Sequence, residues 1–400
     1  MWLGNGAAGG PVWILYQFDR TYKLREMWVW NSNSAFEPAA GFGLKDVTIE
    51  SSMDGTDWTA FGVGHQFARA PGAGGYAHNT TIALDGLATR YLRINVQGNW
   101  GGLSQYGLSE VRFYYVPTQA REPQPPAGAT GVKPDVILNW RAGRDADSHE
   151  VYMSTSREMV ADPGPADPTE ILSQNSYVPN SLELGLTYYW RVDEVNLAEA
   201  ISTWPGDVWS FATAEYLVVD DFEAYTDNSP RRVFQTWRDG AGFSADPFFP
   251  SGYDGNGTGS LVGYDPSFGH IMETTIVHGG GKSMPFEYNN TASVTRSETT
   301  RTFDNAQDWT RAGIRTLVLY FYGDPGNAAA TLYVKVNDTR IVYGGDPANL
   351  AQESWNQWNV DLSAVAASSL KSLKTLTLGV ETGGAGKLLI DDIRLYRIVP

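Results

Sequence analysis

The feature that most limits the fold of this chain is the alternation of apolar and polar residues in short runs. In Tyr91 to Val96 and again in Glu110 to Tyr115, every second residue is apolar, which is the pattern of half-buried strands. No amphipathic helical pattern longer than about three turns is present, and 43 Gly and 21 Pro residues punctuate the runs. The 400 residues therefore predict an all-β fold divided into several domains.

Composition excludes several classes of function. The formal net charge is −16 and the pI is about 4.7, so a phosphate backbone would be repelled and nucleic-acid binding is disfavoured. Cysteine is absent, which excludes disulfides, thiolate zinc sites and thiol nucleophiles. No apolar run is long enough to span a membrane.

A glycine-rich loop lies between the two runs described first and carries Trp100 and Tyr106. Its glycines permit backbone angles that other residues resist, so the loop can present both rings to solvent: Gly98, Gly101, Gly102 and Gly107. An exposed ring suits stacking on the apolar face of a sugar. The alternative is that Trp100 is a core or rim residue, which is a common role for a tryptophan beside strands.

Three blocks match one family in order: WILYQFDRTYKLREMWVWN, VTIESSMDGTDWTAFG and RYLRINVQGNWGGLSQYGLSEVRFY. Through them, Trp13 to Tyr115 resembles the discoidin, or coagulation-factor type C, domain, which includes the family 32 carbohydrate-binding modules. The resemblance implies a jelly roll that binds carbohydrate. The family's opening segment, with its calcium loop, is missing, so no complete calcium site is expected here. Since no signal peptide follows Met1, we expect an export signal upstream and a secreted or cell-surface location.

This resemblance implies that ligand loops 31–36, 69–78 and 99–106 emerge at or near one end of the sandwich. Trp100 and Tyr106 would stack on the sugar. The remaining candidates come from the same loops by position, most of them as hydrogen-bonding groups: Asn31, Asn33, Phe36, Arg69, His78 and Asn99.

Two further domains are expected after the first, which ends near residue 117. Residues 118–131 form a Pro- and Gly-rich stretch that predicts an extended linker. Residues 132–214, with a late TYYWRVDEV strand, resemble a fibronectin type III-like sandwich, and the resemblance implies a spacer. Its tryptophans are expected to pack inside: Trp140, Trp190 and Trp209.

The third domain, residues 215–400, opens with YLVVDDFEAY and closes with LLIDDIRLYRI. These ends resemble the termini of jelly-roll carbohydrate-binding modules of family 11. The resemblance implies a structural Ca²⁺ held by Glu223 and Asp391, with Asp221 and Asp392 as neighbours; such oxygen ligands suit Ca²⁺. The alternative is that these acids are solvated strand edges that discourage aggregation.

Strand alternation inside this domain predicts a second carbohydrate site. In TLVLYFYG, Tyr320 and Tyr322 share one side, and in TLYVKVND, Tyr333 and Lys335 share one side. If the two strands are neighbours in one sheet, these residues form the floor of a glycan groove. The alternative is a tyrosine-rich face covered by another domain.

The function predicted is non-catalytic polysaccharide binding that targets a larger secreted enzyme or surface protein to glycan. Five scattered histidines leave little for a His-based catalytic centre. Two alternatives stay open: a jelly-roll glycoside hydrolase or polysaccharide lyase in the third domain, which needs two acids or a Tyr and a His facing one groove, and a cell-surface adhesion protein. We expect a monomer, compatible with fusion to an upstream catalytic domain.

Overall fold

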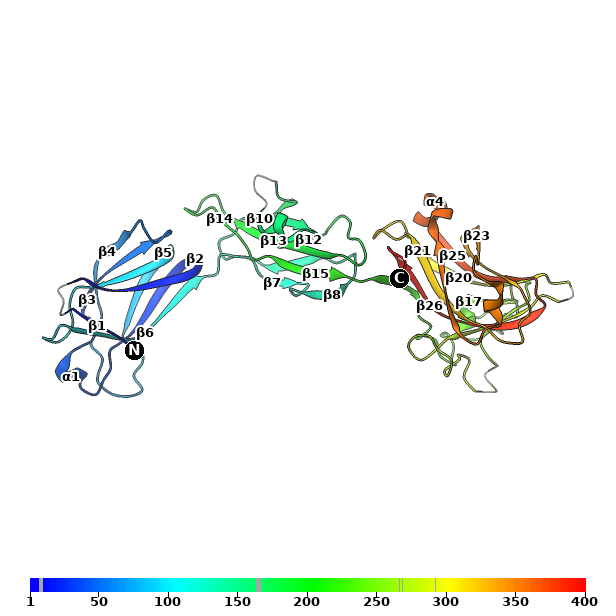
Figure 1. The fold of residues 1–400 in the computed structure, drawn as a ribbon, viewed down its shortest axis with the longest axis horizontal. Coiled ribbons are helices and arrows are strands. Elements are labelled where there is room, and N and C mark those ends of the chain that lie inside the picture. Colours follow the sequence, from blue (N-terminus) through cyan, green and yellow to red (C-terminus); the bar gives the residue numbers. More distant parts are fainter. Residues whose placement is uncertain (7–9, 163–166, 266, 268, 292) are drawn as a thin grey trace. The chain divides into compact units, whose positions relative to one another are not determined.

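The computed structural model describes residues 1–400 except 7–9, 163–166, 266, 268 and 292, and it confirms the all-β prediction (Figure 1). Helices are short: α1 (Glu37–Ala40), α2 (Arg157–Ala161), α3 (Val233–Thr236), α4 (Ala367–Lys371), and the 3₁₀ turns η2 (Pro347–Ala351) and η3 (Leu362–Ala364). Among the described residues, none of these helices has the length and apolar character to cross a membrane.

By its internal contacts the chain divides into two compact units. The first unit comprises residues 1–124, 139–177 and 190–209, and the second comprises residues 125–138, 178–189 and 210–400. The domain boundaries predicted at residues 117, 131 and 214 stay predictions.

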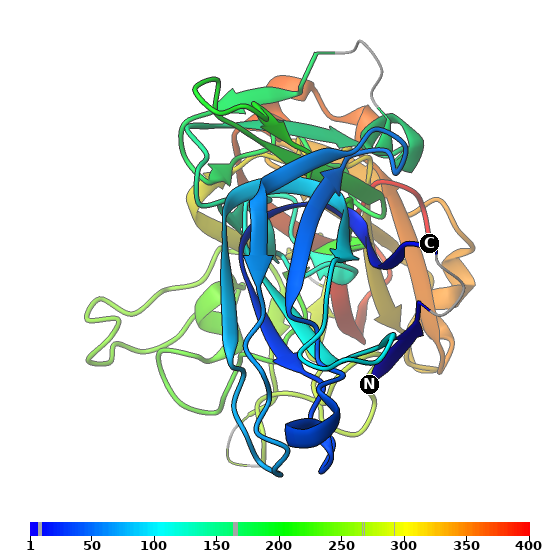
Figure 2. The same cartoon turned by 90° about the vertical axis from the view of Figure 1, so that its left-hand side faces the viewer.

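The N-terminal region forms one antiparallel sheet of six strands, coloured blue to cyan in Figure 2, in the order β1-β6-β2-β5-β3-β4. Their bounds are β1 (Trp2–Asn5), β2 (Val12–Asn31), β3 (Asp46–Ser52), β4 (Thr59–Gln66), β5 (Thr80–Val96) and β6 (Gln105–Val116).

The long strands β2 and β5 belong to both halves of this sheet. Strand β6 pairs only with the second half of β2, from Lys23 onward, whereas β3 pairs only with the second half of β5, from Tyr91 onward. Register shifts between Gln17 and Tyr22 mark the turning point. One core cluster takes Ile14 from the first half of β2 and Met27 from the second, so the bent sheet encloses its own core.

The middle region contains two smaller sheets, in the orders β11-β10-β13-β15-β8, with β14 beside β13, and β12-β9-β7. Their bounds are β7 (Arg121–Gln124), β8 (Ala129–Val132), β9 (Leu138–Arg141), β10 (Ser148–Ser154), β11 (Glu170–Leu172), β12 (Ser176–Tyr177), β13 (Thr187–Val195), β14 (Thr203–Trp204) and β15 (Trp209–Thr213).

The predicted linker, residues 118–131, is not free of regular structure, because it supplies β7 and β8. Strand β7 pairs with β9, and β8 pairs in parallel with β15. Both lie at the edge of their sheets, where a proline such as Pro123 is tolerated. The predicted packing role of the tryptophans is confirmed, since all three are buried: Trp140, Trp190 and Trp209.

The C-terminal region is a sandwich of two antiparallel sheets. The first, here called the β21 sheet, has the order β18-β19-β26-β21-β24 with β16 beside β26; the second, the β22 sheet, has the order β17-β20-β25-β22-β23. Their bounds are β16 (Tyr216–Asp220), β17 (Trp237–Arg238), β18 (Ser260–Val262), β19 (Met284–Asn289), β20 (Arg296–Gln307), β21 (Thr316–Tyr322), β22 (Thr331–Val336), β23 (Thr339–Val342), β24 (Trp355–Asp361), β25 (Leu373–Glu381) and β26 (Ala385–Tyr396).

The apolar sides of β21 and β22 face each other across one core. Leu317, Leu319 and Phe321 of β21 join Leu332 and Val334 of β22 in that core, each at most 1% exposed. The chain passes repeatedly from one sheet to the other, which is typical of jelly rolls. The first and last strands of this region, β16 and β26, pair with each other.

Candidate ligand-binding sites

Two of the predicted ligand loops, 31–36 and 69–78, are tied together at one end of the first sheet. The Nδ2 atom of Asn33 donates a hydrogen bond to the carbonyl of Ala73 at 2.6 Å, and the N–H of Gly72 donates to its Oδ1 at 2.7 Å. These loops therefore lie together as predicted. Both polar atoms of the Asn33 amide are used in joining them.

The third predicted loop, 99–106, packs against the C-terminal end of α1. A Cβ atom on Gly101 would lie only 1.9 Å from the carbonyl oxygen of Ala40, so this approach requires glycine. On the same loop, Nε1 of Trp100 donates to the carbonyl of Phe67 at 2.9 Å. We call loops 31–36, 69–78 and 99–106, together with α1, the loop cluster.

Phe36 is the ring of the loop cluster that is most open to solvent. It precedes α1 and is 75% exposed. Arg69 is also exposed, and its Nη2 donates to the carbonyl of Glu37 at 2.7 Å, which fixes the guanidinium beside the start of α1. An open ring and a held guanidinium therefore both lie beside the start of the same short helix.

Trp100 and Tyr106 are half-buried, so their rings are neither enclosed in the core nor fully exposed to solvent. The indole N–H of Trp100 is engaged, and Nζ of Lys45 lies 5.3 Å from its ring centroid. Tyr106 packs against the core cluster of the first sheet. Their predicted stacking role stays a prediction.

The prediction that Asn31 binds ligand is wrong, because this side chain is fully buried. Its Nδ2 donates to the carbonyls of Leu44 and Ala68 at 2.7 and 2.9 Å, and its Oδ1 accepts from the N–H of Leu44. Asn31 continues the inward series of Met27 and Val29, so its parity on β2 already indicated burial.

Two other predicted ligand residues make contacts within the protein. The Nδ2 atom of Asn99 donates to the carbonyls of Leu103 and Gln105, both at 2.7 Å, and so closes its own loop. His78 stacks on Trp28, with ring centroids 4.0 Å apart and an interplanar angle of 11°.

Sequence reasoning missed the aromatic cluster to which His78 belongs. Trp30 lies edge-on to His78 at 5.3 Å, and Tyr114 lies 4.5 Å from Trp28. The WVW motif of β2 could have indicated this cluster. Its two tryptophans flank the inward-facing Val29 and therefore share the outer side of the strand.

The predicted groove in the C-terminal region is wrong in its premise. Strands β21 and β22 are in different sheets, and their apolar sides meet in the core. Tyr320 and Tyr322 therefore lie on one outer face of the sandwich, whereas Tyr333 and Lys335 lie on the other. The four residues do not share a surface.

On the outer face of the β21 sheet, Tyr320 and Tyr322 belong to a cluster of half-buried rings. His278 stacks on Tyr320 with centroids 3.6 Å apart, and Trp355 lies 5.5 Å from Tyr322 and 5.7 Å from His278. The hydroxyl of Tyr320 donates to Oε1 of Gln357 at 3.0 Å. Sequence reasoning did not connect His278 with this face, because it lies far from β21 in the chain.

On the opposite outer face, Tyr333 cannot stack on a sugar, because it is 1% exposed. Its ring occupies the space that a side chain at position 379 would fill, and the guanidinium of Arg340 lies 4.3 Å from its centroid. Its hydroxyl donates to Oε1 of Glu298 at 2.5 Å, and Nζ of Lys335 lies 2.5 Å from the same oxygen.

The predicted metal ligand Asp391 is fully buried, and Asp392 is 2% exposed, so the alternative of solvated edges is wrong for both. Oδ2 of Asp391 accepts the N–H groups of His278 and Gly279 at 2.8 and 3.2 Å. Oδ2 of Asp392 lies 2.6 Å from Nδ1 of His278. Burial is the main cause that raises the pKa of Asp391 to about 6.

Glu223 reaches the same loop, residues 278–282. Its Oε1 accepts the N–H groups of Gly281 and Lys282 at 2.8 and 2.9 Å. Within the described residues, no group of three or more His, Cys, Asp or Glu side chains is arranged to hold a metal ion. The structure thus brings the two predicted carboxylates, Glu223 and Asp391, to one loop, which Asp392 also reaches.

Comparison with known proteins yields structural likenesses only. No family model matches the chain, and no curated protein matches it. A family 11 carbohydrate-binding module of cellulosomal cellulase Lic26A-Cel5E of Clostridium thermocellum is similar at 15% identity and TM-score 0.27, over 46% of this chain and 96% of that one. A module, CBM32-3, from a family 31 glycoside hydrolase of Clostridium perfringens is similar at 22% identity and TM-score 0.22, over 26% and 67%.

Proposed function

We propose that this chain binds polysaccharide without cleaving it, and that the loop cluster of the first sheet is a binding site. The observation that carries the proposal is Phe36, an aromatic ring 75% exposed at the start of a short helix that three linked loops hold in place. Such a ring can stack on the apolar face of a sugar. Arg69, held beside it, would donate hydrogen bonds to sugar hydroxyls.

The carboxylate of α1 supports binding over hydrolysis. Glu37 is fully buried, and its Oε1 accepts the N–H of Gly43 at 2.8 Å. A glycosidase needs a pair of carboxyl groups that flank the scissile bond. Because Glu37 is held inside, the loop cluster would bind a glycan without cleaving it. Binding would raise the local concentration of the polysaccharide at a fused enzyme or at a cell surface.

The lyase alternative requires a tyrosine and a histidine that face one groove. Tyr320 and His278 do lie together, but their rings stack on each other and the hydroxyl of Tyr320 is bonded to Gln357. The hydroxyl of Tyr320, which would have to give up or return a proton, is therefore engaged within the protein. This arrangement supports a packing role for the pair.

The proposal is tested by affinity electrophoresis and calorimetry of the purified chain with a panel of soluble neutral polysaccharides. We expect Phe36→Ala to weaken binding of the polysaccharide that the wild type retains by about fivefold to tenfold or more, because one stacking ring contributes about 1 kcal/mol or more. Arg69→Ala should also weaken it.

The matched control is Phe248→Ala, which removes an equally isolated phenylalanine, 61% exposed, outside the loop cluster. This variant should bind as the wild type does. Unchanged binding by Phe36→Ala, or release of sugar fragments from the polysaccharide, would contradict the proposal.

A further inference from the structure

The outer side of β2 carries an exposed tryptophan, Trp13. It is 47% exposed, more than any other tryptophan among the described residues. Leu15, two residues later on the same side of the strand, is exposed as well, whereas Ile14 between them belongs to the core of the first sheet. Two neighbouring apolar side chains that stay open to water form a candidate contact surface.

Polar side chains of β5 and β3 lie directly beside this apolar pair. Asn95 of β5 lies opposite Trp13. Arg93 of β5 lies opposite Leu15 on one side and opposite Glu50 of β3 on the other. Residues paired in this way have Cβ atoms about 4.5 to 5.5 Å apart. The apolar pair and the polar side chains therefore form one continuous surface across three strands.

The polar side chains of this surface hold one another in a fixed geometry. Oε2 of Glu50 accepts from Nδ2 of Asn95 at 2.8 Å and from Nε and Nη2 of Arg93 at 2.9 and 2.7 Å. The guanidinium of Arg93 also lies 4.2 Å from the ring centroid of Trp58. Hydrogen bonds from Asn95 and Arg93 lower the pKa of Glu50, so its carboxylate is charged at neutral pH. We call Glu50, Arg93 and Asn95 the outer triad.

Each member of the outer triad keeps one polar atom free. Among the described residues, no hydrogen bond uses Oε1 of Glu50, Nη1 of Arg93 or Oδ1 of Asn95. The buried side-chain atoms that lack a partner belong to other residues, so these three atoms are open to solvent. They offer two acceptors and one donor. Neighbouring hydroxyl groups can use all three, because a hydroxyl both donates and accepts.

We propose that Trp13 and the outer triad bind one sugar ring of a neutral polysaccharide. The indole of Trp13 stacks on the apolar face of the sugar, and neighbouring hydroxyls bond to the free atoms of the triad. The opposite charges of Arg93 and Glu50 compensate each other, which suits an uncharged ligand. The ligand class rests on the proposed function, but the surface uses none of the residues of the loop cluster.

The test is calorimetry of the full chain with cellotetraose, mannotetraose and galactotetraose, in a Phe36→Ala background that removes the first site. We expect at least one tetrasaccharide to bind. Trp13→Ala should weaken it about fivefold to tenfold through the loss of one stacking ring, whereas Trp13→Phe, which keeps a ring, should weaken it less. In NMR spectra, the indole N–H signal that is missing from Trp13→Phe should shift when the sugar is added to the parent.

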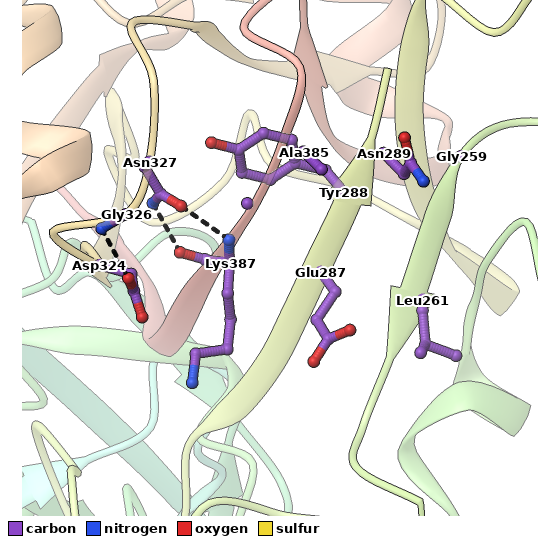
Figure 3. A pocket seen from close by; sticks show the side chains of 11 residues that line it. Gly259, Leu261, Glu287, Tyr288, Asn289, Asp324, Gly326, Asn327, Ala385 and Lys387 are labelled. Carbon is purple, nitrogen blue, oxygen red and sulfur yellow. Dashed lines mark hydrogen bonds between the residues drawn. The ribbon is translucent and has the colours of Figure 1, made fainter. Parts of the chain in front are cut away.

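Glu50→Gln tests the outer triad. Its amide oxygen stays with Arg93, so a nitrogen replaces the free acceptor, and binding should weaken about threefold to tenfold. The matched control is Glu287→Gln. Glu287 is also a half-buried carboxylate on a strand, but it lines a pocket of about 610 Å³ beside β18, β19 and β26 in the C-terminal sandwich (Figure 3). This variant should bind as its parent does.

The proposal is overturned if no tetrasaccharide binds, or if Trp13→Ala binds as tightly as its parent. It is also overturned if Glu287→Gln weakens binding as much as Glu50→Gln does, or if tetragalacturonate binds more tightly than every neutral tetrasaccharide. Equal binding by the wild type and Phe36→Ala would contradict the loop-cluster proposal alone, since the Trp13 variants are compared within one background.

Discussion

Tyr333 shows how a single glycine decides the role of an aromatic residue. Because position 379 lacks a side chain, the ring lies flat over β25, and Arg340 covers its other face. Its hydroxyl and the ammonium of Lys335 then meet at Glu298. A residue that alternation places on an outer face is buried by its own neighbours.

Burial alone would raise the pKa of Glu298, but hydrogen bonds from Lys335 and Tyr333 outweigh it and hold the pKa below its usual value. The folded pKa is depressed, so this stabilisation is present above about pH 4.5 and is lost as the pH falls through the folded pKa. We expect Glu298→Gln to lower the free energy of unfolding at pH 7 by about 1 to 3 kcal/mol.

Chemical denaturation at pH 7 and pH 3 measures this effect, and the difference between wild type and Glu298→Gln should shrink at the lower pH. Glu353→Gln, at an exposed carboxylate outside the strands, serves as the control. A difference that stays constant across this pH range would rule out the ionic role of Glu298.

At the residue scale, the sequence indicates which side chains alternate but not which contacts they make. The parity of Met27, Val29 and Asn31 is readable in the sequence, and it predicts an inward Asn31. The stack of His78 on Trp28 joins two distant segments, and no local pattern encodes that contact.

At the scale of the elements, the main finding is that β2 and β5 each serve both halves of the first sheet. Alternation predicted only the end of β5, as the run Tyr91 to Val96, and it gave no prediction of the bend at Gln17 to Tyr22 of β2. Pairing between distant strands is likewise not a local property. This is why the sequence could state only as a condition that β21 and β22 share a sheet, and the structure places them in two.

The loop at residues 278–282, which Glu223 and Asp391 both reach, supports a prediction about metal dependence. If Ca²⁺ binds there, it binds the folded chain only, and a hundredfold excess over the dissociation constant adds about 2.7 kcal/mol of stability. We expect added Ca²⁺ to raise the melting temperature of the wild type and EDTA to lower it again.

Asp391→Asn and Glu223→Gln should abolish this response to Ca²⁺, while Asp265→Asn, at an exposed acid elsewhere in the same region, should keep it. Identical melting curves of the wild type in Ca²⁺ and in EDTA would show that the acids act through their protein hydrogen bonds alone.

At the scale of the whole molecule, the formal net charge of −16 bears on the choice of polysaccharide. Acidic polymers are repelled at long range, and raising the salt from about 0.01 to 0.1 M shortens the screening length from about 30 to 10 Å. We expect binding to polygalacturonate, if measurable, to strengthen over this range and binding to neutral glucans to stay constant. Calorimetry at both concentrations checks this, and tighter polygalacturonate binding at low salt would contradict it.

The core of the C-terminal sandwich also includes Leu184, a residue from well before its first strand. Leu184 is 1% exposed, its N–H donates to Ala312, and its carbonyl accepts from Nε of Arg397 at 2.7 Å. A fragment that begins near residue 214, where the composition changes, would keep every strand of the sandwich but would lack Leu184. The fragment would expose the apolar cavity that Leu184 fills in the whole chain. It would therefore tend to aggregate in solution even though each sheet was complete.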